Sequence, residues 1–515
     1  MFSTVLSGAV YGIDSYLVHV EVDLSPGLPC FVMVGNLGSE VKEAGERVRV
    51  ALKNSGIQIP PMHIAVNISP GDIRKAGPGF DLPIAVAVLA ALEKIPPDSI
   101  KDRLFVGELS LDGALKPVRG ILPIAVCAAG AGIRRCVVPA ENAQEAAVVQ
   151  DMQVAGAEDF DQVIKYLKMP EEQQRKALLP EEGNQSALDE YKAQEGRKLD
   201  FADIQGQEYA KQAALIGAAG FHHMLIIGPP GAGKTMIARR IPTILPPLSP
   251  KESLEVSSLY SISGKLQKGR ALMEERPFLS PHHSISPQAL AGGGKIPRPG
   301  VISLAHRGVL FLDELPEFKR QTIDLLRQPL EDKEIQIARN SGFFTYPADV
   351  MMVGAMNPCP CGYYPDRNKC RCTPFEVHNY LSHISGPVLD RIDICIPVRK
   401  VDIRLMQSGQ KGMGSEEMRR QVMKARSRQE QRYRGTPFRF NSDLVSGEVE
   451  KYCALGKEEK GYLEKIFQSM DFSARSYHRL LKVARTIADL ADSEAIKKEH
   501  LQQAVCYRQG ELLEN

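Results

Sequence analysis

Residues Gly228–Thr235 have the types and the spacing that suit the binding of nucleotide phosphates. They read Gly-Pro-Pro-Gly-Ala-Gly-Lys-Thr, which fits the pattern G-x-x-x-x-G-K-[ST]. The apolar run Met224–Ile227 precedes them and a helical pattern follows from Met236, as this motif requires. The start of a helix offers free N–H groups and a positive dipole end to an anion.

This segment predicts an ATP site. Lys234 is expected to reach the β- and γ-phosphates, and the Thr235 hydroxyl is expected to hold Mg²⁺. The residues predicted to bind the nucleotide are Gly228, Pro229, Pro230, Gly231, Ala232, Gly233, Lys234 and Thr235.

An acidic pair supplies the second half of the predicted site. Gly308–Leu312 has the pattern of a buried strand, and Asp313 and Glu314 follow it directly. A carboxylate at such a strand tip can hold the Mg²⁺ shell, and a second can polarise the attacking water. With both halves present, ATP hydrolysis is favoured over a glycine-rich turn without a ligand.

Three further polar residues are candidates for the same chemistry. Asn357 ends the apolar run from Val350, where it is either a sensor of the γ-phosphate or a turn-forming residue before Pro358. Arg391 precedes an apolar strand, as a surface charge or as an arginine finger for a neighbouring subunit. Arg475 opens a helix that could cover the nucleotide as part of a lid.

The elements that must position these residues fall into separate regions. With 515 residues, the chain has room for about three domains of ~100–200 residues each. Strand and helix patterns alternate over 1–165, a polar linker follows over 166–199, and a second α/β region spans 200–400. Helical periodicity dominates 401–515.

Composition describes an ordinary folded protein. Hydrophobic residues make up 43% and charged residues 24%, and no apolar run approaches the ~18 residues of a membrane helix. The N-terminus lacks a signal-peptide pattern, so a cytoplasmic location without a membrane is expected. The net charge of +2 neither indicates nor excludes nucleic-acid binding.

Taken together, these segments resemble the AAA+ ATPases, and most closely the YifB/ComM family of the magnesium-chelatase-like branch. Gly228–Thr235 matches Walker A, Asp313 and Glu314 match Walker B, and Asn357 falls at sensor 1. Arg391 falls at the arginine finger, and Arg475 at sensor 2 with Arg479 as a nearby competitor. Gln207 belongs to a segment that resembles the family's box near the adenine. The family-specific blocks are Pro281–Pro287, Ser303–Phe318 and Ser473–Leu490.

The resemblance implies a fold and an assembly. A central αβα P-loop domain would carry the ATP site, a C-terminal helical lid would cover it, and subunits would form a homo-oligomer, a hexameric ring. The region 1–165 resembles the Lon-protease domain, with a ribosomal S5 domain 2-like fold. Gly79 and Leu122 stand where that family's catalytic Ser and Lys are expected, so peptide hydrolysis is disfavoured.

Two insertions suggest contact with DNA. One contains Gly292–Gly300, and the other, Ile335–Tyr346, has the pattern of a β-hairpin turning near Ser341 and Gly342. In DNA translocases of similar build such insertions line the pore of the ring. Candidate phosphate contacts are Lys295, Arg298 and Arg339, each of which taken singly is equally well explained as an exposed loop cation.

Four cysteines form two close pairs. Cys359 and Cys361 are separated by eight residues from Cys370 and Cys372, a C-x-C-x₈-C-x-C arrangement. Four thiolates suit tetrahedral Zn²⁺, so a structural Zn²⁺ is favoured over four reduced thiols.

A cationic stretch near the start of the C-terminal region has two explanations. A solvated helix or an intersubunit salt-bridge surface is favoured over a DNA-backbone stripe. Its members are Arg419, Arg420, Lys424, Arg426, Arg428, Arg432 and Arg434.

The function favoured by these features is an ATP-driven motor on DNA. The resemblance implies a helicase or branch-migration activity on single-stranded or branched DNA, in recombination or natural transformation. A chelatase-type ATPase that drives a partner in metal insertion is the alternative, and an ATP-dependent protease ranks last because of Gly79 and Leu122.

Overall fold

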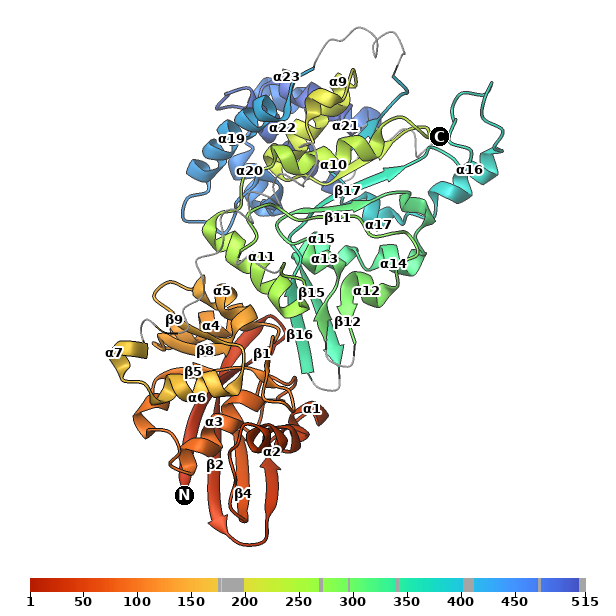
Figure 1. The fold of residues 1–515 in the computed structure, drawn as a ribbon. Helices are drawn as coiled ribbons and strands as arrows, with labels where there is room; N and C mark the ends of the chain where they lie inside the picture. Colours follow the sequence, from red (N-terminus) through yellow and green to blue (C-terminus); the bar gives the residue numbers. More distant parts are fainter. Residues whose placement is uncertain are drawn as a thin grey trace.

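The structure is a computed structural model. It describes residues 1–174, 177, 199–267, 272–294, 297–339, 342–401, 412–470 and 474–508. Most of the predicted linker 166–199 lies outside these residues, although helix α6 (Phe160–Lys168) runs past residue 165 and α7 (Glu171–Gln174) follows it. In Figure 1 the N-terminal region, drawn in red to yellow, lies at one end of the molecule.

The N-terminal region is built on a mixed sheet with the strand order β3-β4-β2-β1-β5-β8-β9. Side chains of β2 alternate between the two faces, and Val18, Val20, Val22 and Leu24 are buried, as a half-buried strand requires. The strands are β1 Phe2–Tyr11, β2 Asp14–Pro26, β3 Cys30–Val34, β4 Met62–Ser69, β5 Arg103–Phe105, β8 Arg135–Pro139 and β9 Gln153–Ala157, with the short pair β6 Glu108–Leu109 and β7 Leu115–Lys116.

Helices cover this sheet. Every residue of α3 (Asp81–Ala91) is buried, because its sequence is apolar around almost the whole circumference and it packs between the sheet and α2. The remaining helices are α1 Ser39–Lys42, α2 Ala44–Asn54, α4 Ile121–Gly130 and α5 Ala140–Ala147. The α/β pattern predicted for this region is present.

The central region contains a parallel five-stranded sheet with the order β11-β14-β17-β10-β18. The inner strands β10, β14 and β17 are buried along their whole length, as parallel strands covered on both faces must be. The strands are β10 Met224–Ile227, β11 Phe278–Leu279, β14 Val309–Leu312, β17 Met351–Met356 and β18 Ile394–Pro397.

The helices around this sheet include α10, which begins at the end of the glycine-rich turn. They are α9 Glu208–Gly220, α10 Lys234–Ile244, α11 Pro250–Ser263, α12 Pro287–Ala291, α13 Val301–Leu304, α14 Arg320–Asp324, α15 Arg327–Asp332, α16 Pro374–Leu381 and α17 Gly386–Leu389.

Two antiparallel hairpins extend from the central region toward the N-terminal region (Figure 1). The first pairs β12 (Gly292–Gly293) with β13 (Arg298–Pro299), and the second pairs β15 (Glu334–Arg339) with β16 (Gly342–Pro347). The second hairpin is the one predicted from the sequence.

The C-terminal region is helical, as predicted, and it shares a core with the central region. Met418 and Val422 of α19 pack in one buried cluster with Ala213 and Ile216 of α9. Its helices are α19 Ser415–Arg432, α20 Ser446–Tyr452, α21 Lys457–Met470, α22 Ala474–Leu490 and α23 Lys498–Cys506. Among the described residues, no helix is long and apolar enough to cross a membrane.

The N-terminal region contacts two elements of the central region. The rings of Tyr11 and Phe344 lie 4.5 Å apart between centroids, so β1 touches the second hairpin. The Ser261 hydroxyl on α11 donates a hydrogen bond to Glu145 on α5. The N-terminal region is therefore attached both to the hairpin and to α11.

Candidate functional site

Three polar segments meet where neighbouring strands of the central sheet end. In the parallel register, Ile227 of β10 lies beside Met356 of β17, and Leu312 of β14 lies beside Gly354. The glycine-rich turn, Asp313 and Asn357 follow these strands directly. Ligands of open parallel sheets bind at this carboxyl edge, so the topology places the predicted site residues together.

Lys234 lies at the centre of this group. Its ammonium donates hydrogen bonds to Gly228 O at 2.7 Å, to Pro229 O at 3.1 Å and to Asn357 Oδ1 at 2.9 Å. Burial lowers the pKa of Lys234, and the negative charges of Asp313 and Glu314 oppose this. The structure therefore brings Asn357 to the lysine that ends the glycine-rich turn.

The two acidic residues take different positions. Thr235 Oγ1 donates to Asp313 Oδ2 at 2.8 Å, so the hydroxyl and the carboxylate already share one location. Glu314 is exposed, has a left-handed backbone with φ of 52°, and lies 3.3 Å from Nδ1 of His283. Hydroxyl and carboxylate oxygens are the ligands that Mg²⁺ prefers, so Thr235 and Asp313 fit that ion.

The turn needs glycine for conformational and for packing reasons. Gly231 and Gly233 have φ of 76° and 87°, in the left-handed region that L side chains rarely adopt. A Cβ on Gly228 would lie 2.3 Å from Val398 O, so the turn passes directly against the end of β18. Gln207 also lies beside the turn, where its Nε2 donates to Arg399 O at 2.5 Å and to Ala232 O at 3.4 Å.

Arg391 lies elsewhere, in a cavity of about 300 Å³ between the central and C-terminal regions. The residues that line this cavity include none of Gly228–Thr235. Arg391 Nη1 donates to Pro387 O at 2.6 Å, and Nη2 is paired with Glu331. Burial and the charges of Arg475 and Arg479 lower the pKa of Arg391.

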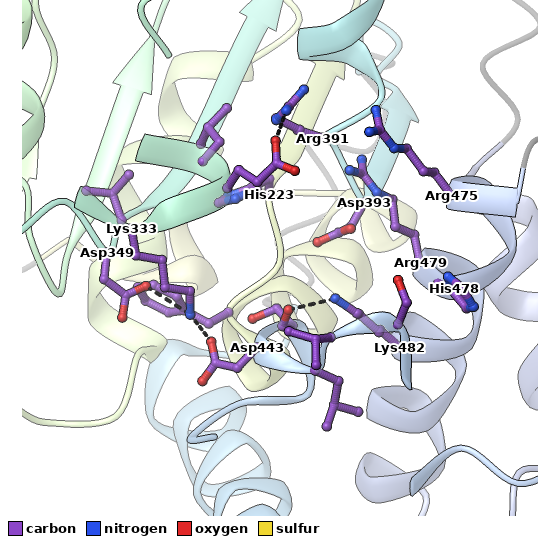
Figure 2. A pocket seen from close by; sticks show the side chains of 18 of the residues that line it. His223, Lys333, Asp349, Arg391, Asp393, Asp443, Arg475, His478, Arg479 and Lys482 are labelled. Atoms are coloured by element: carbon purple, nitrogen blue, oxygen red, sulfur yellow. Dashed lines mark hydrogen bonds and ion pairs between the residues drawn. The ribbon is translucent and has the colours of Figure 1, made fainter. Parts of the chain in front are cut away.

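Arg475 and Arg479 of α22 line the same cavity. Figure 2 shows their guanidinium groups at the end of the cavity where Arg391 lies. Among the described residues, Nε of Arg391 and Nη1 of Arg479 are buried without a hydrogen-bond partner. The structure thus brings Arg475 together with Arg391 and not with Lys234, which differs from a lid residue over the nucleotide of its own chain.

A buried network fixes the strand that follows Arg391. Asp393 hydrogen-bonds with Nδ1 of His222 at 3.1 Å, and Nε2 of the same ring hydrogen-bonds with Thr486 of α22 at 2.8 Å. Burial acts to raise the pKa of Asp393, but the His222 hydrogen bond and nearby cations hold it below its ordinary value. The carboxylate therefore stays charged and ties α22 to the arginine cavity.

Three family models match the chain in succession. "Subunit ChlI of Mg-chelatase" matches residues 20–142, "Magnesium chelatase, subunit ChlI" matches 200–406, and "Magnesium chelatase, subunit ChlI C-terminal" matches 412–508. "Uncharacterized protein YifB" of Salmonella typhimurium is 42% identical over 504 residues, 97% of this chain and 96% of that protein. "Competence protein ComM" of Haemophilus influenzae is 42% identical over 506 residues, 98% of this chain and 97% of that protein.

The chain belongs to the YifB/ComM family of magnesium-chelatase-like proteins. The predicted family resemblance is thereby confirmed. Membership implies an AAA+ ATPase that uses ATP and Mg²⁺. "Lon protease 1" of Sorangium cellulosum is 31% identical over 135 residues, 24% of this chain and 16% of that protein, so the Lon likeness is partial.

In this YifB/ComM-family chain, Gly79 and Leu122 occupy the positions expected for the catalytic Ser and Lys of Lon proteases, and both make packing or backbone contacts. A Cβ on Gly79 would lie 3.3 Å from Cγ1 of Val106. Leu122 is fully buried, and its N–H donates to Oε1 of Glu145 at 3.0 Å. The same Glu145 oxygen accepts the Ser261 hydroxyl, so the position predicted to lack a catalytic lysine lies beside the contact with α11.

The two YifB/ComM-family insertions lie against each other. A Cβ on Gly292 would lie 3.0 Å from Cδ1 of Ile337, and one on Gly293 would lie 2.8 Å from Nη2 of Arg339. Arg298 and Arg339 are both exposed. Lys295 lies outside the described residues. Phe343, at the end of the second hairpin, is 79% exposed, and the sequence prediction had not singled it out.

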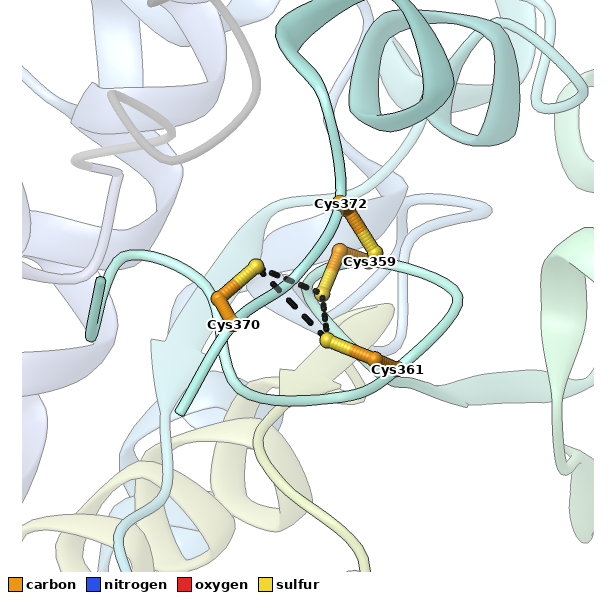
Figure 3. Close-up of side chains that lie close together, drawn as sticks. All are labelled: Cys359, Cys361, Cys370 and Cys372. Atoms are coloured by element: carbon orange, nitrogen blue, oxygen red, sulfur yellow. Dashed lines mark hydrogen bonds between the residues drawn. The ribbon is translucent and has the colours of Figure 1, made fainter. Parts of the chain in front are cut away.

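The four cysteines of this family member lie close together in the loop that follows Asn357. Figure 3 shows Cys359, Cys361, Cys370 and Cys372 facing one another, and their sulfur atoms all lie within 4.8 Å of one another. The predicted juxtaposition of the two pairs is therefore present.

The cationic stretch is largely engaged in contacts within the YifB/ComM-family chain. Arg426 lies over the ring of Phe440, with its guanidinium carbon 4.1 Å from the centroid. The ion pairs are Arg420 with Glu417, Arg426 with Glu430, Arg428 with Asp492, and Arg432 with Asp489. Such pairing within the chain agrees with the solvated helix, one of the two alternatives favoured over a DNA-backbone stripe.

Sequence reasoning missed two partners of the site. Glu331 pairs with Arg391, and His283 lies beside Glu314. His283 belongs to the family-specific block Pro281–Pro287, which was the signal that could have drawn attention to it. Glu331 carries no such signal, because its pairing depends on how α15 packs.

Proposed function

We propose that this chain is the subunit of an ATP-hydrolysing ring motor that acts on DNA. The observation that carries the proposal is the meeting of Lys234, Thr235, Asp313 and Asn357 at one sheet edge. The arginine candidates for the same reaction lie in a separate cavity of the chain. A complete site would then need residues from two subunits.

Each residue has a role in phosphoryl transfer to water. Lys234 would exchange its two carbonyl partners for β- and γ-phosphate oxygens, and Thr235 with Asp313 would hold Mg²⁺. Bound Mg²⁺ would supply neutralisation of the phosphate charge. Glu314 is the proposed general base, which orients the attacking water and accepts its proton. Its carboxylate is exposed next to Asp313, so it can reach a water molecule at the site. Asn357 positions the γ-phosphate and the water through its amide, and Gln207 borders the nucleotide.

The second half of the site comes from the neighbouring subunit. Arg391 is the proposed arginine finger, and Arg475 with Arg479 would add further cationic donors at the same end of the cavity. The unpartnered N–H groups of Arg391 and Arg479 support an anion delivered from outside this chain. The proposed assembly is a homo-oligomer closed into a hexameric ring, located in the cytoplasm.

The paired hairpins are the proposed DNA contact. Arg298 and Arg339 are exposed cations on adjacent hairpins, which suits phosphates that are bound without reading base sequence. Lys295 is retained as a third candidate, and exposed Phe343 could stack on an unpaired base. The name of the relative "Competence protein ComM" supports a role in competence for this chain.

The cofactors proposed for this motor are ATP and Mg²⁺ at the sheet edge and a structural Zn²⁺ at the four cysteines. Zn²⁺ takes no part in the hydrolysis, because four protein thiolates leave no open position for water.

The testing experiment measures ATPase activity with no DNA, with single-stranded DNA and with branched DNA, alongside strand displacement. Stimulation by DNA together with strand displacement is expected. Activity that ignores DNA, with no DNA binding at low salt, would contradict the DNA part of the proposal, since phosphate contacts are strongest there. Negative-stain images with ATP would report the ring.

A further inference from the structure

The sulfur atoms of Cys359, Cys361 and Cys370 have the spacing of a tetrahedral metal site, and that of Cys372 lies within 4.8 Å of each of them. Cys359 Sγ lies 3.4 Å from Cys361 Sγ and 3.8 Å from Cys370 Sγ, and Cys361 Sγ lies 3.6 Å from Cys370 Sγ. With Zn–S bonds of about 2.3 Å, the sulfur atoms of a zinc tetrahedron are about 3.8 Å apart. The set comes from two short segments that approach each other across the loop between them (Figure 3).

Backbone amides surround these sulfur atoms. The Tyr364 N–H donates to Cys359 Sγ at 3.4 Å, and the amides of Tyr363 and Arg371 hydrogen-bond to Cys361. The amide of Cys372 hydrogen-bonds to Cys370, and that of Cys361 to Cys372. Each of the four sulfur atoms therefore has a backbone amide beside it as a hydrogen-bond donor, the kind of outer contact that orients a metal ligand.

The loop also carries the charge that such a centre needs. Four thiolates and one Zn²⁺ leave a net charge of about −2. Between the cysteine pairs and beside them stand the cations Arg367, Lys369 and Arg371 and the single carboxylate Asp366. Their excess of positive charge offsets the negative centre, which is otherwise costly to enclose.

We infer that Cys359, Cys361, Cys370 and Cys372 bind one Zn²⁺ ion, and that this centre braces the nucleotide site. Binding converts the four thiols to thiolates, and their four protons pass to water. The brace rests on the proposed function, because it acts on the residues assigned there to ATP.

The cysteine loop touches the glycine-rich turn at a glycine, which has no side chain to hold the two segments apart. Gly362, which follows Cys361, has φ of 83°, and a Cβ there would lie 2.5 Å from Cδ of Pro230 in the glycine-rich turn. On the other side, Cys359 follows Asn357 by two positions. The Asn357 N–H hydrogen-bonds to the hydroxyl of Tyr380 on α16, the helix that packs on the cysteine cluster through Val377.

Metal binding therefore fixes both ends of one short segment. Asn357 is held where its amide meets Lys234, and Gly362 is held against Pro230. If the metal is lost and the cysteine loop changes shape, both contacts weaken together. The glycine-rich turn then loses the segment that packs against it.

The metal is tested first on the unaltered full-length protein. Elemental analysis after purification without chelators should find one zinc per chain. Replacing zinc by Co²⁺ should give the thiolate-to-cobalt absorption bands of a tetrahedral sulfur site. Iron in place of zinc, or no stoichiometric metal together with four freely titrating thiols, overturns the assignment. None of these readouts depends on hydrolysis or on a variant that must fold.

The brace is tested with two variants. Cys370→Ser/Cys372→Ser should lose the zinc and bind ATP about tenfold more weakly, the scale on which supporting groups tune a site. Gly362→Ala should keep the zinc and show a similar loss, because its added methyl separates the two loops. Gly461→Ala is the control, since a Cβ there meets nothing within 4 Å. Unchanged ATP affinity in both test variants overturns the brace.

A third variant separates this inference from the proposed function. Lys234→Ala should lose ATP binding and retain one zinc per chain. If Lys234→Ala binds ATP as well as the natural protein does, the proposed nucleotide site is wrong, whereas the zinc content still reports on the metal centre alone.

Discussion

The Thr235 hydroxyl donates a 2.8 Å hydrogen bond to Asp313, a residue 78 positions further along the chain. This bond joins the start of α10 to the residue that follows β14, two elements that also share a buried core. Both groups are thus preorganised for one cation, and Lys234 and Asn357 are linked in the same way beside them.

Lys234→Ala should remove ATP binding. Lys234 is expected to donate at least two hydrogen bonds to the phosphates. Each hydrogen bond of a charged group contributes roughly 1.5–3 kcal/mol to the free energy of binding. ATP affinity should therefore fall by about 100-fold or more, measured with a fluorescent ATP analogue. The control is Lys251→Ala, an exposed lysine on α11, which should bind ATP normally.

Glu314→Gln should bind ATP and stop turning it over. The amide keeps the shape of the side chain but cannot accept a proton from water, and general-base catalysis contributes about 10²–10⁴-fold to the rate. Steady-state phosphate release and ATP binding are measured together. Exposed Glu317→Gln, three positions away, should hydrolyse ATP at the natural rate. Normal turnover in Glu314→Gln would remove this residue from the mechanism.

Arg391→Ala should reduce kcat by about 10³–10⁵-fold, the contribution of an arginine finger. Because this arginine is assigned to a neighbour's nucleotide, mixing inactive Arg391→Ala subunits with inactive Lys234→Ala subunits should restore part of the activity. Some interfaces of a mixed ring then contain Arg391 on one side and Lys234 on the other. Arg419→Ala, a change at an exposed arginine, should not affect activity. Mixed rings that stay inactive would argue for a site within one subunit.

Arg298→Ala and Arg339→Ala should each weaken DNA binding equally for all base sequences. Each phosphate contact contributes a slope of about −0.7 to −0.9 in the dependence of log affinity on log salt. The slope should therefore shrink by about one for each substitution, measured by fluorescence anisotropy at several salt concentrations. Arg320→Ala, at an exposed arginine of α14, should leave the slope unchanged.

The protein should lose stability in acid partly through His223. Its Nδ1 accepts the Met352 N–H at 3.2 Å, and burial lowers the pKa of His223 from 6.5 to about 4. The unfolded chain therefore takes up a proton first, so this contribution is complete above pH 6.5 and is lost as the pH falls toward 4.

His223→Asn places an amide oxygen where Nδ1 lay and cannot titrate. Its free energy of unfolding should fall less between pH 7 and pH 4.5 than that of the natural protein, measured by urea denaturation. His19→Asn, at an exposed histidine, should follow the natural protein. An equal loss in His223→Asn would place the acid sensitivity on other groups.

The residues that the sequence located best are those fixed by local pattern. Lys234, Asp313 and Asn357 each follow a strand that is apolar along its whole length, and parallel strands end at one edge of a sheet. Their meeting could be foreseen without knowing any helix packing. The hairpin of Ile335–Tyr346 was equally readable, because its alternation of buried and exposed residues is local.

Other relationships depend on packing and could not be foreseen. Arg475 joins Arg391 because α22 packs on α9 and α19, which no short pattern encodes. Gly362 meets Pro230 across more than a hundred positions, and neither residue type signals the other. Helix α6 continues past residue 165 because Tyr166 and Leu167 complete the N-terminal core.

The cavity that holds Arg391 and Arg479 has a consequence for the isolated subunit. An enclosed donor without an acceptor costs about 1–3 kcal/mol, and this cavity contains two such N–H groups among the described residues. In the proposed ring, an isolated subunit would bear that cost, and a neighbour that brings a phosphate against the cavity would relieve it. Bound nucleotide would then stabilise the contact between subunits before it is hydrolysed.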